Sequence, residues 1–219
     1  MTPTPRPVRT DFRSAAKCIL LRCAVLMGSL IASAPALTVD FIWTGAISND
    51  FNTAGNWSVG LVPGSTGLDI RVNIDQPGTV TVNVPTSSTH TINWNLQIGT
   101  DDALNIANAA TFNLAGGGAV VNNGKLSLSS SFHNTNLVIT SGTVTLGGTG
   151  AIELGNHPAN RIYGATGTDH LINAAGHTIK GAGQLGVGLL TLTNQGLILA
   201  NTTNSLQILP SSGGLTNTG

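Results

Sequence analysis

Short stretches in which apolar and polar residues alternate recur along the chain after residue 78. Clear examples are TVTVNV at 79–84, TINWNLQI at 91–98, KLSLS at 125–129 and TVTL at 143–146. Successive side chains of a β-strand point to opposite faces, so alternation with a period of two predicts a strand with one apolar face. No amphipathic helix of ten or more residues is visible after residue 36. The pattern predicts an all-β fold built from short strands.

A phrase repeats between these stretches. LTNQGLILA begins at Leu192 and LTNTG at Leu215, and related phrases begin at residues 106, 120, 138 and 172. Their fifth positions are separated by 14, 18, 34, 20 and 23 residues, and we interpret the interval of 34 as two turns of about 17. A second phrase, G-x-G before an apolar residue, supports a repeat because Gly148 and Gly181 are 33 residues apart. The aligned fifth positions are Ala110, Gly124, Gly142, Gly176, Gly196 and Gly219.

These repeats predict a right-handed parallel β-helix, a form of β-solenoid. Strands of four to six residues, separated by corners at intervals near 20, fit a coil of about three strands per turn, stacked about 4.8 Å apart. Leu126, Val144 and Ile198 are then expected in the core. A β-sandwich or jelly roll also contains regular short strands and is the alternative, which the repeated phrases disfavour.

Glycine and asparagine are the predicted corner residues, because both adopt left-handed backbone conformations readily. Asparagine side chains stacked from coil to coil could also form ladders of amide hydrogen bonds. The expected ladder members are Asn108, Asn122, Asn194 and Asn217. The structural corner residues are Gly124, Gly142, Gly176, Gly196, Asn122 and Asn194.

Residues 37–77 differ from the repeats that follow. Phe41, Trp43, Phe51 and Trp57 are four of the eight aromatic residues after residue 36. The open end of a solenoid needs cover, so this stretch is predicted to be an N-terminal aromatic-rich cap. Coils would follow over residues 78–219, truncated where the last phrase breaks off. The alternative is that the aromatic rings form platforms for sugars.

The first 36 residues read as a secretory signal peptide. A basic segment precedes the apolar run CAVLMGSLIA at 23–32, and APA at 34–36 suits cleavage before Leu37. The apolar run is about half the roughly 20 residues that span a bilayer. We therefore expect export to the extracellular space or the outer cell surface.

Composition narrows the function further. Charged residues make up 8% of the chain, so Ser, Thr, Asn and Gly must cover the surface. After residue 36 there are four basic and eight acidic side chains, a net charge of −4. No basic stripe remains, which argues against nucleic acid and anionic membranes as partners. Both cysteines, Cys18 and Cys23, lie in the signal segment, so no disulfide is expected.

Catalytic chemistry would need carboxylates and basic groups that converge on one groove. The candidates are Asp101 with Asp102, Asp169 with His170, and His177 with Lys180; of these, the two aspartates after Gly99 could converge because they lie in a turn. The calcium-binding repeat G-G-x-G-x-D is not met, since GGTGAI has Ile152 in place of Asp. We expect no catalytic residue, metal or cofactor.

The chain resembles a known group of proteins in the segment WTG…FNTAGNWSVGLVPG (43–64) and in LINAAGHTIKGAGQLG…LTLTNQGLILANTTNSLQILP (171–210). It is similar to secreted bacterial β-solenoid proteins of the autotransporter-passenger and PEP-CTERM type, with a filamentous-haemagglutinin-like β-helix. The resemblance implies a parallel β-helix at the Gram-negative cell surface or in the extracellular matrix, often adhesive. Such proteins usually carry a C-terminal anchor, so membrane contact would require a segment missing after Gly219.

The function predicted is a secreted or surface-exposed structural or adhesive protein without catalytic activity. Its expected partners are an extracellular polysaccharide or a host or matrix surface. The alternative is a carbohydrate-binding or polysaccharide-active module; a third reading is a scaffold whose acting domain lies downstream. The carbohydrate contacts of the alternative would be Trp43, Trp57, Trp94, Asp101 and Asp102.

Overall fold

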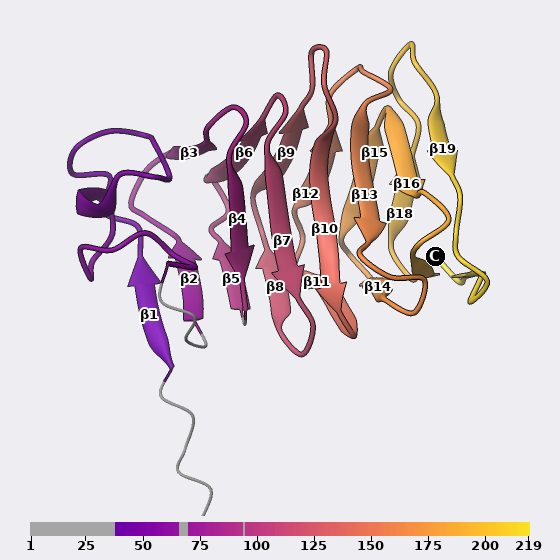
Figure 1. Cartoon of the computed structure of the whole chain (residues 1–219), viewed down its shortest axis with the longest axis horizontal. Helices are drawn as coiled ribbons and strands as arrows, with labels where there is room; N and C mark the ends of the chain where they lie inside the picture. The colour runs from indigo at the N-terminus through magenta and orange to yellow at the C-terminus, as the bar shows by residue number, and fades with distance from the viewer. Residues whose placement is uncertain (1–37, 66–69, 94) are drawn as a thin grey trace, which may run out of the picture. The chain divides into compact units, whose positions relative to one another are not determined.

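Three parallel β-sheets form a β-solenoid of about six turns (Figure 1). The structure is a computed structural model that describes residues 38–65, 70–93 and 95–219. From β2 onward each turn contributes one strand to each sheet in a fixed order, and all strand pairs within the sheets are parallel. The all-β class and the solenoid are confirmed, and the antiparallel sandwich is excluded. Within the described residues the helical content is one 3₁₀ turn, Ala54–Asn56.

The sheets are called first, second and third in the order in which the chain enters them. The first corner leads from the first sheet to the second, the second corner from the second sheet to the third, and the third corner from the third sheet back to the first. The first sheet contains β1 (Val39–Ile42), β2 (Ile70–Ile74), β5 (Asn95–Ile98), β8 (Ala119–Asn122), β11 (Thr143–Gly147), β14 (His170–Asn173), β17 (Thr191–Asn194) and β20 (Leu215–Asn217). The second sheet contains β3 (Thr81–Val84), β6 (Ala103–Ala107), β9 (Lys125–Ser129), β12 (Ala151–Leu154), β15 (Thr178–Gly181) and β18 (Leu197–Leu199). The third sheet contains β4 (Thr89–Ile92), β7 (Thr111–Ala115), β10 (Thr135–Ser141), β13 (Asn160–Gly164), β16 (Gly183–Gly186) and β19 (Leu206–Ile208).

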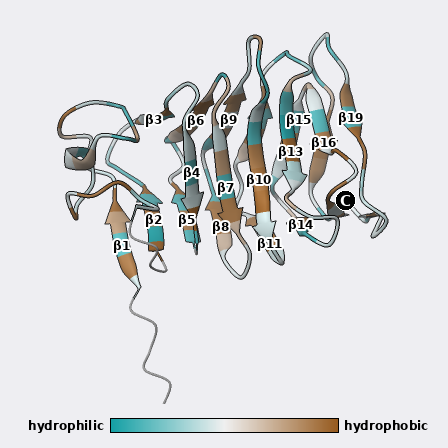
Figure 2. Ribbon diagram, viewed as in Figure 1, coloured by the Kyte–Doolittle hydropathy of each residue, from teal (hydrophilic) through white to brown (hydrophobic). Residues whose placement is uncertain are grey.

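Alternation along each strand separates the interior from the surface. Hydrophobic and hydrophilic residues share the same strands (Figure 2), and the apolar ones stack in columns inside the coils. In the second sheet Leu126 lies beside Ile152 of the next coil. Leu126 and Val144 are fully buried, while Ile198 is partly buried against the same core. Each such side chain contributes about 1.5–3 kcal/mol on full burial, so the columns are the main stabilising feature.

The repeat predicted from the phrases is wrong in its alignment. Gly124, Gly176 and Gly196 lie in the first corner, but Ala110 lies in the second and Gly142 in the third. Val144 pairs directly with Leu171, so the interval of 34 residues covers one turn plus one side rather than two turns of 17. Hydrogen-bonded side chains on neighbouring coils are between 20 and 27 residues apart. Small and amide residues serve all three corners, so composition alone could not tell the corners apart.

A second correction concerns TINWNLQI. Its alternation crosses the third corner, so residues 91–92 end β4 in the third sheet and residues 95–98 form β5 in the first.

The predicted corner glycines are required for two different reasons. Gly142 and Gly176 have φ angles of +63° and +88°, which disfavour residues with a Cβ. Gly124 and Gly196 instead lie against the backbone of the previous coil, where a Cβ would come 2.2 Å from carbonyl oxygens. Close stacking therefore requires glycine at these two positions.

An amide ladder exists at the first corner with changed membership. Asn194 donates from Nδ2 to Oδ1 of Asn217 at 2.7 Å, which confirms that pair, and Asn173 donates in the same way to Asn194 at 2.7 Å. Asn108 is not a member, because it lies at the second corner. There its Oδ1 accepts the backbone N–H groups of residues 131–133.

Four aromatic side chains, Phe41, Trp43, Phe51 and Trp57, form a buried cluster in the stretch predicted as a cap. Trp57 meets the other three rings edge to face at centroid distances of 4.9–6.5 Å, and its Nε1 donates to the Phe51 carbonyl at 2.9 Å. Phe51 also meets Phe112 of β7 at 5.8 Å. The same stretch supplies β1 and β2 to the first sheet, with Val39 opposite Ile70. The boundary at residue 77 stays a prediction.

The predicted signal peptide and its cleavage site lie outside the described residues. Among the residues that the structure describes, no helix is long and apolar enough to span a membrane.

Candidate functional site

The two described tryptophans of the carbohydrate hypothesis are buried. Trp43 is 1% and Trp57 is 2% exposed, so neither ring presents a face to solvent. Trp94 lies outside the described residues. Among the aromatic residues that the structure describes, Phe132 is prominently exposed, at 84%, on the second-corner loop held by Asn108. No sequence motif marks Phe132 as a candidate contact.

Asp101 and Asp102 lie in the first corner after Gly99, as expected, but their side chains have different environments. Asp101 is exposed, whereas Asp102 is buried. The Asp102 carboxylate accepts backbone N–H groups from Val80 at 2.9 Å and Gln76 at 3.0 Å. Asp102 therefore fixes the backbone of the previous coil rather than forming a carboxylate pair with Asp101.

The other candidate pairs are also separated. Asp169 is buried and accepts hydrogen bonds from the backbone N–H and hydroxyl of Thr166, while His170 bonds Thr193 on the outer face of the first sheet. His177 is buried, whereas Lys180 is on the outer face of the second sheet. The structure does not bring these four groups into one groove.

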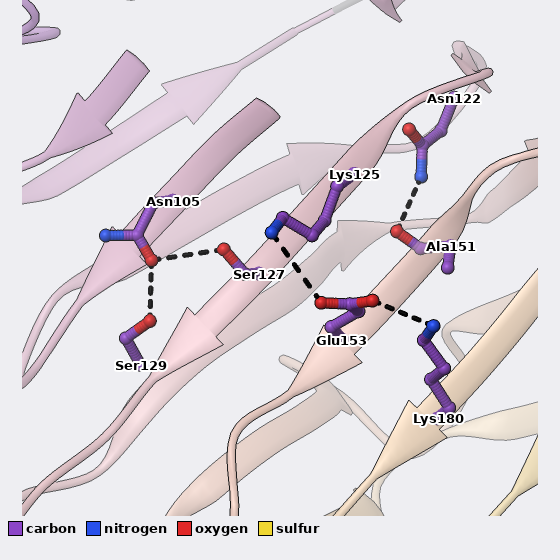
Figure 3. Close-up of polar contacts among 8 residues, drawn as sticks. All are labelled: Asn105, Asn122, Lys125, Ser127, Ser129, Ala151, Glu153 and Lys180. Carbon is purple, nitrogen blue, oxygen red and sulfur yellow. Dashed lines mark hydrogen bonds and ion pairs between the residues drawn. The ribbon is translucent and has the colours of Figure 1, made fainter. Parts of the chain in front are cut away.

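His177 links two coils inside the first corner. Its Nδ1 is 2.7 Å from Oδ1 of Asn173, and its Nε2 is 3.2 Å from Nδ2 of Asn122. Nδ2 of Asn122 also donates to the Ala151 carbonyl at 2.9 Å (Figure 3). This contact fixes the orientation of the amide, so the atom that faces Nε2 of His177 is a nitrogen, which can only donate a hydrogen bond. The imidazole is consequently neutral, with its proton on Nδ1. Burial lowers the pKa of His177 to about 4.

A row of polar side chains follows the outer face of the second sheet. Asn83, Asn105, Ser127, Glu153 and Lys180 are register partners on successive coils from β3 to β15. With strands about 4.8 Å apart, the row extends over about 19 Å. We call these five residues the polar row.

Hydrogen bonds connect the first half of the polar row. Asn105 donates to Asn83 at 3.1 Å. It also accepts from Ser127 at 3.1 Å and from Ser129 at 2.6 Å (Figure 3). These contacts hold the side chains in fixed positions across three coils.

The second half of the polar row is charged. Glu153 lies between Lys180, at 2.8 Å, and Lys125, at 3.8 Å (Figure 3). Lys125 comes from the neighbouring row, opposite Ala151. All three side chains remain between one third and one half exposed. The group carries a net charge of +1 on a chain that is otherwise acidic after residue 36.

Two hollows lie along this polar row. The first has a volume of about 340 Å³ and is lined by Asn105, Ser127 and Glu153, among others. The second, of about 230 Å³, contains Glu153 and Lys180 and is bounded by Asn201 and Thr202. Glu153 and Gly155 line both hollows, so the two hollows adjoin, and we call them together the second-sheet groove.

The second-sheet groove offers amide, hydroxyl, ammonium and carboxylate groups in a line. Such groups can bind an extended polar ligand, and the two ammonium groups can bind anions. Among the described residues, no group of three or more His, Cys, Asp or Glu side chains could hold a metal ion. A third hollow, of about 260 Å³, lies on the first sheet, where Arg71 pairs with Asp40 at 3.6 Å.

Sequence reasoning did not identify the second-sheet groove. KLSLS, AIEL and HTIK each place one charged residue at an outward position, but only the correct register puts Lys125, Glu153 and Lys180 side by side. The phrase alignment had the wrong register, so the cluster could not be predicted.

Comparisons with known proteins add no relative. No protein-family model, no curated protein and no solved structure matches the chain.

Proposed function

We propose that the protein is a secreted or surface-exposed structural or adhesive β-solenoid without catalytic activity of its own. The observation that carries this proposal is the stack of coils, in which a continuous apolar interior supports outward rows of fixed polar side chains. Stacked repeats of this kind provide extended binding surfaces. A function based on contact needs such a surface and no convergent catalytic groups.

Export is part of the proposal and is supported by the sequence of residues 1–36. The resemblance to autotransporter-passenger and PEP-CTERM proteins supports a location at the cell surface or in the matrix. Mass spectrometry of the protein secreted by a Gram-negative host should find Leu37 at its N-terminus. Recovery of the intact chain only from the cytoplasm would overturn the export step.

Adhesion is tested with the purified chain coupled to beads. We expect the beads to attach to at least one surface coated with polysaccharide or matrix protein, and uncoated beads to remain free. The same polysaccharides, incubated with the protein in solution, should keep their chain length and release no reducing ends. Depolymerisation would contradict the absence of catalysis. Beads that attach to none of the coated surfaces would contradict adhesion.

Carbohydrate binding is the second candidate function. The second-sheet groove favours it, because a line of amides and hydroxyls on a rigid face can hydrogen-bond a sugar chain.

A further inference from the structure

We infer that the second-sheet groove is a binding site for a carboxylated polysaccharide. This inference rests on the adhesive part of the proposed function and names its ligand class. The bound chain would run along the polar row, with its carboxylates near Lys125 and Lys180 and its hydroxyls near Asn105 and Ser127.

Shape is the first argument. The polar row crosses five successive coils, and its repeat of about 4.8 Å is comparable with the length of one sugar unit in a chain. Small residues at Ala103, Gly155 and Gly181 contribute to the lining of the two hollows and leave space above the sheet. Two adjoining open hollows along one row of polar side chains suit a linear polymer better than a compact metabolite.

Preorganisation is the second argument. Asn105 holds Ser127 and Ser129 through its Oδ1 and Asn83 through its Nδ2, so these groups lose little freedom when a ligand binds. Each hydroxyl oxygen can still accept a hydrogen bond. The row therefore presents ordered partners for sugar hydroxyls.

Charge is the third argument. Lys125 and Lys180 are two of the four basic residues after residue 36, and they share one carboxylate, Glu153. An ammonium has three donor hydrogens, and Glu153 does not use all of them. A ligand carboxylate can bind the remaining donors, whereas the other acidic residues of the chain disfavour polyanions elsewhere on the surface.

The test is a calorimetric titration of the full chain with alginate in calcium-free buffer. The matched ligand is the propylene glycol ester of alginate, in which the same backbone carries uncharged carboxyl groups. We expect binding to alginate that weakens with added salt and that is at least about fivefold weaker for the ester. Absence of binding to alginate, or equal binding to the ester, overturns the inference. Equal binding to a DNA duplex at the same charge concentration also overturns it, since the site would then select only for negative charge.

Variants locate the site. K180Q should lower the affinity for alginate about fivefold, while R71Q, which removes one charge from the outer face of the first sheet, should leave it unchanged. E153Q should raise the affinity, because it frees both lysines, whereas D40N on the first sheet should not. Equal effects of K180Q and R71Q, or of E153Q and D40N, would contradict the groove as the site.

The bead assay separates the inference from the proposed function. Attachment that persists in the K125Q/K180Q variant would overturn the groove as the adhesive surface and leave adhesion standing. Beads that attach to no surface would overturn adhesion, and the alginate titration would then decide the groove by itself.

Discussion

The aromatic cluster and the last described coil both contain large apolar side chains, but these are buried in the cluster and partly exposed in the coil. Phe41, Trp43, Phe51 and Trp57 are almost completely buried at the start of the described chain. In β19 and β20 the inward positions Ile208 and Leu215 are exposed, although their register partners on the previous coil, Leu185 and Leu192, are buried. The register partners Leu192 and Leu215 show the difference most clearly, since they are 1% and 42% exposed. Burial in a solenoid thus depends on the neighbouring layer as much as on the alternation of the strand.

A buried charge should reduce the free energy of unfolding more in the interior coils than in the less covered last coil. Leu126→Asp places a carboxylate between Leu104 and Ile152, and we expect a loss of about 5 kcal/mol in the free energy of unfolding. Ile198→Asp, in the less covered β18, should cost about 2 kcal/mol because water reaches that side chain. Denaturant unfolding measures both values. Equal losses would show that coverage by the next coil does not matter.

Removal of an aromatic ring should destabilise the protein at a buried position of the aromatic cluster but not at an exposed position. Phe51→Ala should destabilise the protein by about 4 kcal/mol, because a buried ring that contacts Trp57 and Phe112 is lost. Phe132→Ala is the matched control at an exposed site and should change stability by less than about 0.5 kcal/mol. A small effect of Phe51→Ala would refute a stabilising role of the aromatic cluster.

The register partners Leu192 and Leu215 test how much a covering coil contributes to the stability of one stacked position. Leu192→Ala should cost about 3 kcal/mol, as for other buried leucines. Leu215→Ala should cost about 1 kcal/mol, since the side chain is already half in water. Thermal unfolding of both variants gives the comparison, and the reverse order would contradict it.

Acid should weaken the first corner. The unfolded His177 titrates near 6.5, but in the folded protein its pKa is lowered to about 4 by burial. The unfolded state therefore binds more protons between these values, so stability is constant above about pH 7 and falls as the pH decreases toward 4. We expect a loss of about 2 kcal/mol at pH 5 from this group.

Unfolding at a series of pH values, with His177→Gln as the control, checks this prediction. The variant should lose the His177 part of the slope. The variant should retain the contribution of His90 to the pH dependence. Burial lowers the pKa of His90, and the charge of Asp50 opposes that effect. An unchanged slope in His177→Gln would contradict the assignment.

The sequence predicted those features that depend on one strand at a time. Alternation placed Leu126 and Val144 correctly in the core, and the glycine phrases predicted corners, because both signals are local. Register is not local. Asn122 meets His177 from 55 residues away, and Lys125, Glu153 and Lys180 come from three coils. The corners differ in length from coil to coil, because extra residues in a corner leave the strands unchanged. The sequence spacing therefore did not indicate that Asn122 meets His177, or that Lys125, Glu153 and Lys180 lie together.

For Trp43 and Trp57 the sequence favoured a cap that covers the core, but it could not exclude the alternative of sugar platforms. An aromatic ring near a solenoid end can cover the core or face a ligand, and the sequence pattern is the same in both cases. The hydrogen bond from the Trp57 indole to the Phe51 carbonyl and the edge-to-face contact with Trp43 fix the first arrangement.

Amide hydrogen exchange of the full chain tests most directly whether coverage controls the stability of each coil. The account predicts that backbone amides of the aromatic cluster, such as that of Phe51 bonded to Asn83, exchange as slowly as those of β11. Amides of β19 and β20 should exchange much faster. Uniform protection from β1 to β20, or faster exchange in the aromatic cluster than in β20, would contradict it.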